Sequence, residues 1–361
     1  MAVNLAACVT SFLVAFLVLP LIIKYTIRKN LVDTPGRRKI HKKVTPSLGG
    51  VAIFAGFLVA ALVWMDYEQW NIIRYILASL LLIFLIGVRD DLVPLRALHK
   101  LYGQIVAIVI LLFSGININS FYGLFGIEEI PVWIGYSLTV ITIVIITNAF
   151  NLIDGLDGLA GSVGLVALMA FGFWFFWVGD MIFALFAFSL VGGILAFLVF
   201  NWQPAEIFMG DTGAMVIGMM LSIMAIHFTE ANDQLAFGHS ARFEAPIASA
   251  GCFVIVPLAD TLRIIILRIS RRQSPFKPDK SHIHHALMRL GLTHGRTALI
   301  LAAVNLVFIL FSFIGKNASN NSKLMAVVVI VGGLSFALDR IIIRKTKKKG
   351  KVSMRKAKRT I

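Results

Sequence analysis

The chain has 361 residues, of which 58% are hydrophobic and only 14% are charged, and its formal net charge at pH 7 is +16. Its mean hydropathy is +0.87. A soluble domain has about 25% charged residues, so this balance excludes an ordinary soluble protein. The composition indicates a chain that lies within a membrane.

Long apolar runs occur along the whole chain. A helix needs about 20 predominantly apolar residues to cross a bilayer, and by that measure the sequence predicts eleven spanning helices. They lie at 3–27, 48–65, 70–88, 102–118, 131–150, 159–178, 181–200, 213–229, 247–267, 298–314 and 324–343. Strands of a membrane β-barrel would alternate in polarity over about 10 residues, and these runs do not alternate. We expect an all-α polytopic integral membrane protein with one transmembrane domain, residues 1–343.

Lys and Arg are distributed unevenly between the connecting segments. One set of loops, together with the tail, contains 27 of them, and the other set contains three. The basic segments are 28–47, 89–101, 268–297 and the tail 344–361. Basic loops mark the cytoplasmic side, so we expect the N-terminus outside and the C-terminus in the cytoplasm. For the tail, contact with anionic membrane lipids is favoured over nucleic-acid binding.

Acidic residues recur where these helices meet the expected cytoplasmic side. The segment 148–158 contains two Asp, two Asn and two Gly residues, and further acids occur at Asp90, Asp91 and Asp211. Ionisable residues in such positions indicate a functional site. Segments 148–158 and 201–212 contain no Lys or Arg, so an acidic pocket there needs a cation. Oxygen ligands from Asp and Asn suit Mg²⁺, with Mn²⁺ as an alternative.

Basic residues in the flanking loops supply an anion-binding counterpart. They are Arg37, Arg38, Lys42, Lys43, Lys100, His282, His284 and His285. Carboxylates with Mg²⁺ beside basic side chains are what phosphoryl transfer requires, because its catalysis consists mostly of positioning and charge neutralisation.

Each of these motifs also has a purely structural interpretation. Asp90 and Asp91 could cap a helix, and Asp211, between a glycine and Thr-Gly, could be a turn or N-cap residue. The histidines could form a solvated loop or bind a transition metal. Asp260 lies three residues before Arg263 on a helix, which favours an ion pair at least as much as a catalytic role.

Taken together, the motifs resemble those of the polyprenyl-phosphate N-acetylhexosamine-1-phosphate transferases, glycosyltransferase family 4. The matching segments are 33–50, 90–104, 148–158, 208–213 and 274–285. The eleven spans and the His-Ile-His-His sequence are similar to the common-antigen and teichoic-acid linkage branch. The related phospho-MurNAc-pentapeptide translocases typically have three consecutive histidines and ten helices, and here the chain departs from them.

The resemblance implies a role for each matching residue. Asp211 corresponds to the principal Mg²⁺ ligand, and Asn151 and Asp154 lie in the motif that completes or supports the metal site. Asp90 corresponds to the acid that deprotonates the lipid phosphate, with Asp91 beside it; together with Asp154 these form the expected catalytic set. The implied substrate-binding residues, around the uracil ring, the nucleotide or the diphosphate, are Lys42, Lys100, Asn148, Asp157, Asn201, Phe208, His282, His284 and His285.

The activity implied is transfer of an N-acetylhexosamine-1-phosphate, with GlcNAc expected, from a UDP-N-acetylhexosamine to a polyprenyl phosphate such as undecaprenyl phosphate. UMP is released, and the step begins the assembly of a cell-envelope polysaccharide at the bacterial cytoplasmic membrane. The alternatives are a phospho-MurNAc-pentapeptide transferase and a membrane transporter. A transporter would have ionisable residues near mid-helix and broken, repeated helices. Homodimer formation is left open.

Overall fold

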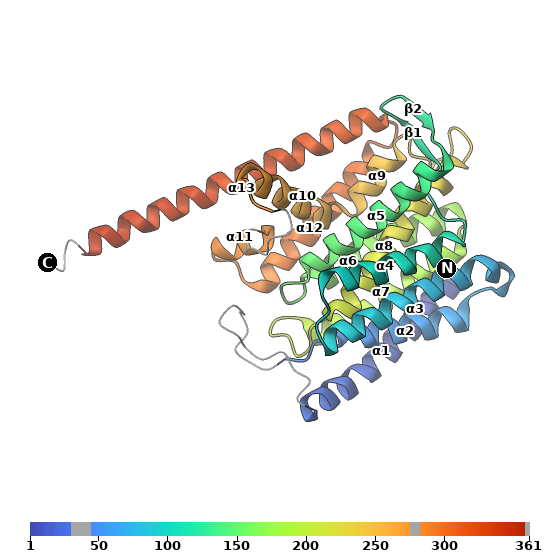
Figure 1. Ribbon diagram of the computed structural model, residues 1–361, viewed down its shortest axis with the longest axis horizontal. Helices are drawn as coiled ribbons and strands as arrows, with labels where there is room; N and C mark the ends of the chain where they lie inside the picture. Colours follow the sequence, from blue (N-terminus) through green and yellow to red (C-terminus); the bar gives the residue numbers. More distant parts are fainter. Residues whose placement is uncertain (30–44, 275–281, 358–361) are drawn as a thin grey trace.

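The computed structural model describes residues 1–29, 45–274 and 282–357, with side chains up to Lys345 in the last range. Figure 1 shows a bundle of helices from which the last helix extends. The helices are α1 (Ala2–Arg28), α2 (Gly49–Trp64), α3 (Trp70–Leu92), α4 (Ala97–Leu112), α5 (Val132–Ile153), α6 (Leu159–Val178), α7 (Met181–Asn201), α8 (Gly210–Asp233), α9 (Pro246–Phe253), α10 (Ile255–Ser270), α11 (Ile283–Arg289), α12 (His294–Ile314) and α13 (Asn320–Ala357). A short 3-10 helix, η1 (Tyr67–Gln69), precedes α3, and β1 (Ser120–Leu124) pairs antiparallel with β2 (Ile127–Glu129).

The predicted all-α polytopic membrane fold is confirmed. By length and composition, eight helices of the described chain can cross a membrane, or nine if the bent pair α9–α10 counts as one span. The expected number of eleven is not confirmed, because α2 and α4 have only 16 residues each. At about 1.5 Å per residue such a helix is about 24 Å long, shorter than a hydrocarbon core of about 30 Å.

The span predicted at 247–267 as one continuous helix is broken, which corrects the sequence-based expectation. Helices α9 and α10 meet at Val254 with an angle of 89°. Pro257 has no N–H to donate to the Phe253 carbonyl one turn earlier. The Asn305 side chain of α12 takes its place, donating to the Phe253 oxygen (3.0 Å) and accepting from the Val256 N–H (3.3 Å). The break therefore leaves these backbone groups satisfied, as a membrane interior requires.

Helix α8 forms the centre of the bundle. All its residues from Thr212 to Ile226 are buried, and it packs against α2, α3, α5, α6 and α9. Glycines allow the closest of these contacts: a Cβ atom on Gly50 of α2 would lie 2.0 Å from the Gly213 nitrogen of α8. This packing fixes the position of the first turn of α8, which contains Asp211.

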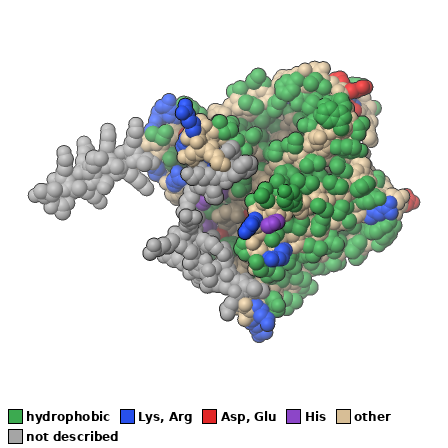
Figure 2. Space-filling view, viewed as in Figure 1, with side chains coloured by type: hydrophobic (Ala, Val, Ile, Leu, Met, Phe, Trp, Pro, Cys, Tyr) green, Lys and Arg blue, Asp and Glu red, His purple; other side chains and the backbone are tan. Residues whose placement is uncertain are grey.

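The sides of the bundle are apolar, and the motifs gather at one end. Figure 2 shows hydrophobic side chains over most of the visible surface, with Lys and Arg concentrated toward the ends. Ile314 and Phe113 are 87% and 69% exposed, as lipid-facing side chains would be. Helices α3, α5 and α7 end, and α4, α6 and α8 begin, at the motif-bearing end, whereas the β1–β2 pair lies at the opposite end (Figure 1). Which end faces the cytoplasm stays a prediction.

Candidate active site

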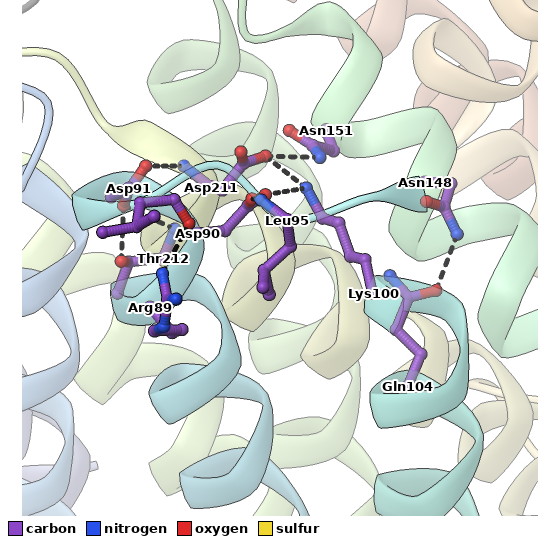
Figure 3. A network of polar contacts seen from close by, with 11 residues as sticks. Arg89, Asp90, Asp91, Leu95, Lys100, Gln104, Asn148, Asn151, Asp211 and Thr212 are labelled. Carbon is purple, nitrogen blue, oxygen red and sulfur yellow. Dashed lines mark hydrogen bonds and ion pairs between the residues drawn. The ribbon is translucent and has the colours of Figure 1, made fainter. Parts of the chain in front are cut away.

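Asp211 lies at the centre of a polar cluster formed by the four helices α3, α4, α5 and α8 (Figure 3). Its Oδ1 atom accepts hydrogen bonds from Lys100 Nζ of α4 (2.6 Å) and from Asn151 Nδ2 of α5 (2.7 Å). The sequence predicted that Asp211 and Asn151 share a site, although 59 residues separate them in the chain. The structure places them in direct contact.

Asp90 and Asp91 are consecutive on α3 but have different partners. Asp90 Oδ2 lies 3.0 Å from Lys100 Nζ, and its Oδ1 accepts from the Leu95 N–H (2.5 Å). The Lys100 ammonium therefore bridges Asp90 and Asp211. Asp91 instead accepts hydrogen bonds from the backbone of Asp211 and from Thr212. Neighbouring helical residues differ by about 100° in direction, which accounts for the two targets.

Asp154 follows the last residue of α5 and is partly buried beside this cluster. Burial, and then the negative charges of Asp211 and Asp91, raise its pKa to about 8. An aqueous Asp has a pKa of about 3.9, so the ionised form of Asp154 is disfavoured by its burial and by the neighbouring carboxylates. A bound cation would favour that ionised form.

The residues expected around the nucleotide lie next to the same end of the bundle. Asn148 Nδ2 donates to Gln104 Oε1 (2.9 Å) and to the Val144 carbonyl (2.8 Å). Asn201 joins two loops, because its Oδ1 accepts from the Gly158 N–H and its Nδ2 donates to the Ile207 carbonyl, both at 2.7 Å. Both polar groups of the Asn201 side chain therefore form hydrogen bonds with the protein's own backbone. Contact of Asn201 with a uracil ring stays a prediction.

Asp157 and Phe208 belong to these two loops. Asp157 is 3% exposed, and its Oδ2 lies 3.4 Å from the Ala205 nitrogen and 3.2 Å from His294 Nδ1. Phe208 is anchored through its backbone, which donates to the Pro46 carbonyl (2.7 Å). The sequence predicted Asp157 as a site residue but did not indicate its partner His294, because nothing in the spacing of the two residues links them.

The three histidines lie together at the start of α11, where the rings of His282 and His284 are stacked and that of His285 is tilted against His284. The ring centroids of His282 and His284 are 5.5 Å apart, and those of His284 and His285 are 4.3 Å apart. His284 Nε2 lies 3.0 Å from where a Cβ atom on Gly155 would be, so the stack adjoins the 154–158 loop. Burial, and then the neighbouring His285, lower the pKa of His284 to about 4. His284 is therefore neutral near pH 7.

Asp260 holds this histidine segment in place, which the sequence did not predict. Asp260 Oδ2 lies 2.9 Å from His282 Nδ1, and its Oδ1 accepts from the Ile283 N–H (2.7 Å). Arg263 pairs with Asp339 of α13. The contacts of Asp260 therefore join α10 to the start of α11, while its expected ion pair with Arg263 stays a prediction. Lys42, predicted to bind substrate, lies outside the described residues.

The donor set fits Mg²⁺ better than a transition metal. Among the described residues, no group of three or more His, Cys, Asp or Glu side chains is arranged to hold a metal ion, so the three histidines give no support to a transition-metal site. Mg²⁺ commonly takes only one or two carboxylates and completes its coordination with water and substrate phosphates. Asp211, Asn151 and Asp154 offer such oxygens in an environment with excess negative charge.

Known proteins with a similar sequence were compared with this chain. Residues 73–229 match the sequence model of glycosyl transferase family 4. The chain is 32% identical over 329 residues to a probable undecaprenyl-phosphate N-acetylglucosaminyl 1-phosphate transferase of Bacillus subtilis, covering 90% of this chain and 88% of that relative. It is 31% identical over 299 residues to an undecaprenyl-phosphate alpha-N-acetylglucosaminyl 1-phosphate transferase of Yersinia pestis, covering 81% and 79% of the two chains.

A third relative is the decaprenyl-phosphate N-acetylglucosaminephosphotransferase of Mycolicibacterium smegmatis, 31% identical over 297 residues, or 76% of this chain and 73% of the relative. These matches extend over most of both chains, and the residues that match the family model, 73–229, include Asp90, Lys100, Asn151 and Asp211. The chain therefore belongs to the polyprenyl-phosphate N-acetylhexosamine-1-phosphate transferase family, as its motifs predicted.

Proposed function

We propose that this protein transfers N-acetylglucosamine-1-phosphate from UDP-N-acetylglucosamine to a polyprenyl phosphate, with Mg²⁺ as cofactor and UMP as the second product. The relatives' names support the sugar phosphate and the lipid acceptor. Undecaprenyl phosphate is the acceptor that we expect, at the cytoplasmic face of a bacterial membrane. The excess of Lys and Arg in the segments at the motif-bearing end supports that orientation.

One observation carries the proposal: carboxylates from two helices, Asp90 of α3 and Asp211 of α8, converge on the ammonium group of Lys100. Lys100 Nζ contacts both Asp90 and Asp211. The Asn151 amide of α5 donates to the same Asp211 oxygen as Lys100 does. A site of this kind can hold a divalent cation and a diphosphate together, because the carboxylates attract the metal and the ammonium attracts the phosphate oxygens. Transfer of a sugar phosphate needs both interactions at the same place.

Mg²⁺, when bound by Asp211 with support from Asn151 and Asp154, would neutralise charge on the diphosphate of the donor. Lys100 would contribute a second positive charge on the same side. The acceptor phosphate attacks the β-phosphorus of the donor, the bond from that phosphorus to the bridging oxygen breaks, and UMP leaves. A phosphomonoester has a second pKa of about 6, so the acceptor is mostly dianionic and Asp90 has only a residual proton to accept.

The remaining motifs are suited to holding the donor. His282, held by Asp260, and the adjoining His284 lie next to the 154–158 loop. A neutral His284 imidazole can donate one hydrogen bond to a sugar or phosphate oxygen. The bilayer holds the acceptor's polyprenyl chain, so the nucleotide reaches the site from water and the lipid from the membrane.

A transporter would share some of these features, and the bend at α9–α10 is one of them. Two observations favour the enzyme. The acids lie at the end of the bundle, not near mid-helix, and the relatives that match over most of the chain have transferase names.

The test is release of UMP by purified protein in lipid nanodiscs that contain undecaprenyl phosphate, with UDP-GlcNAc, UDP-GalNAc or UDP-MurNAc-pentapeptide as donor. We expect UMP only with UDP-GlcNAc, with the lipid acceptor and with Mg²⁺, and formation of an equal amount of lipid-linked sugar. Loss of activity in EDTA that Mg²⁺ restores would support the cofactor. UMP release without the acceptor, or preference for another donor, would overturn the corresponding part of the proposal.

A further inference from the structure

Asp91 has a different environment from its neighbour Asp90. Both oxygens of Asp91 point toward the first turn of α8: Oδ1 accepts from the Asp211 N–H (2.8 Å), and Oδ2 accepts from the Thr212 N–H (3.0 Å) and from Thr212 Oγ1 (2.5 Å). Asp90 instead contacts Lys100 and the Leu95 N–H. Figure 3 shows the two carboxylates directed to opposite sides of the Asp211 backbone.

The start of α8 needs such a partner. The first four N–H groups of a helix have no acceptor within it, and the N-cap residue of α8, Met209, has no side chain that could supply one. A carboxylate at this position also interacts favourably with the helix dipole. Asp91 thus caps α8 from a neighbouring helix, and it does so through the N–H of Asp211 itself.

The backbone around this contact leaves little room for movement. Gly210 has a φ of +74°, and a Cβ atom on it would lie 2.0 Å from the Ser47 carbonyl oxygen and 2.6 Å from Asp91 Oδ2. One turn before Asp91, a Cβ atom on Gly87 would lie 2.5 Å from the Thr212 Cα. The Asp91 carboxylate is therefore enclosed by the α3 and α8 backbones, with its acceptor oxygens already engaged.

We infer that Asp91 is a positioning residue: by capping α8 it fixes the Asp211 side chain relative to Asp90, Lys100 and Asn151, and it neither binds the metal nor transfers a proton. This inference rests on the proposed function and revises the catalytic role that the sequence suggested for Asp91. It assigns the two adjacent acids different tasks, with Asp90 facing the reacting groups and Asp91 supporting the metal ligand.

The inference is tested by comparing Asp91→Asn with Asp91→Ala and with Asp90→Asn. Asn keeps one of the two acceptor oxygens that cap α8 and Ala keeps neither, so Asp91→Asn should keep turnover within about tenfold of wild type, whereas Asp91→Ala should lose about 100-fold or more. Asp90→Asn should not show this rescue by an amide. The pH dependence of turnover in Asp91→Asn should match that of wild type, because no proton passes through this residue.

A second measurement is independent of catalysis. Mn²⁺ binding to each purified variant, followed by electron paramagnetic resonance, should weaken about tenfold in Asp91→Ala and less than threefold in Asp91→Asn, because the cap controls the position of the ligand Asp211. Gly210→Ala, which disturbs the same turn without changing any carboxylate, should weaken binding as Asp91→Ala does. Asp233→Asn, at the far end of α8, is the control variant.

An inactive Asp91→Asn enzyme that folds and binds Mn²⁺ normally would overturn the inference, because the negative charge itself would then be needed for the chemistry. If Asp91→Ala does not fold, the Asn variant and Gly210→Ala still decide the matter. Failure of the wild-type protein to release UMP in the presence of lipid phosphate would instead contradict the proposed function. The two failures are therefore distinguishable.

Discussion

Both ends of α8 carry carboxylates, but their surroundings differ. At the β-strand end, the Glu230 carboxylate accepts from Asn119 N (3.1 Å), Asn119 Nδ2 (2.9 Å) and the Tyr122 hydroxyl. At the other end, Asp211 shares the Lys100 ammonium with Asp90, and burial, followed by the charges of Asp211 and Asp91, raises the pKa of Asp154 to about 8.

The difference separates structural carboxylates from functional ones. Glu230 has partners from its own chain, and these partners pin the β1–β2 pair to α8. The described residues of the Asp211 end bring four carboxylates together, those of Asp90, Asp91, Asp154 and Asp211, and strongly perturbed acids such as Asp154 are typical of functional sites. Substitutions at the Asp211 end of α8 should therefore reduce turnover, whereas substitutions at the Glu230 end should reduce the stability of the fold.

The largest effect is expected for Asp211→Asn. A neutral amide is a poor replacement for an anionic Mg²⁺ ligand, so we expect turnover to fall by about 1,000-fold or more, with little rescue by added Mg²⁺. The measurement is UMP release over a range of Mg²⁺ concentrations. The matched control is Asp233→Asn on the last turn of the same helix, which should stay near wild-type activity. Near-normal turnover in Asp211→Asn would remove the metal assignment.

Lys100→Met is expected to have the second largest effect. The substitution removes the charge that bridges Asp90 and Asp211 and that would contact the donor diphosphate, so turnover should fall by about 100-fold. Mn²⁺ binding measured without nucleotide should tighten, because an ammonium that competes for the Asp211 carboxylate is gone. The control is Lys316→Met near the opposite end, where Nζ donates to the Ser240 carbonyl (3.0 Å). Weaker Mn²⁺ binding in Lys100→Met would contradict the bridging role.

These two residues also indicate how far the sequence could predict the site. Apolar run length predicted helices that begin or end within two residues of Asp211, Asp90 and Asn151. The membrane places the ends of such helices in a common layer, so the convergence of these residues was predictable. What could not be predicted was direction around the helix axis. Asp90 and Asp91 are adjacent residues of the same type, so the sequence does not distinguish them. The packing of α3 against α8 directs Asp90 to Lys100 and Asp91 to the α8 backbone.

The histidine side was predictable to a smaller extent. The bend at Val254 depends on Asn305 of α12. Its side chain accepts from the Val256 N–H and donates to the Phe253 carbonyl at the broken turn. An apolar run on its own predicts a continuous helix there. The partnership of Asp260 with His282 follows from the bend and so could not be seen in the sequence, where Arg263 is the nearer partner.

The buried side chain of His284, at the motif-bearing end, makes the stability of the protein depend on pH. Its pKa is about 4 in the folded protein and about 6.5 in an unfolded chain, so between these values the unfolded chain binds more protons. Stability therefore falls as the pH decreases from 6.5 toward 4, by about 2 kcal/mol at pH 5. Thermal unfolding at pH 7 and pH 5 would show this, and His284→Asn should lose that share of the pH dependence. His239→Asn, an exposed histidine at the opposite end, should leave it unchanged; equal pH dependence in both variants would contradict the assignment.

Glu230→Gln should reduce stability and leave turnover within about twofold of wild type. The amide keeps one acceptor oxygen but places an N–H₂ group against the donors of Asn119, so about 1 kcal/mol should be lost. Burial and Glu230 hold the pKa of Tyr122 well above its usual range, so the phenol remains a donor. The thermal midpoint and UMP release, measured on one preparation, check both parts. A large loss of turnover at an unchanged midpoint would show that the two ends of α8 are coupled.

The smallest effect is expected from removing the residues after Arg344. Helix α13 continues without interruption from Asn320 to Ala357, so the basic tail extends a helix and does not form a separate unit. Among the described contacts, truncation removes the bond from Lys345 Nζ to the Leu290 carbonyl on the α11 side, and no residue of the polar cluster.

We expect turnover per correctly inserted molecule to stay within about threefold, while the fraction inserted, or attraction to anionic lipid, decreases. Turnover and membrane-inserted yield must therefore be measured separately. A folded, inserted truncation that loses more than about 100-fold in turnover would mean that the tail acts on the site, and that the excess charge at the Asp211 end is balanced by residues beyond Arg344.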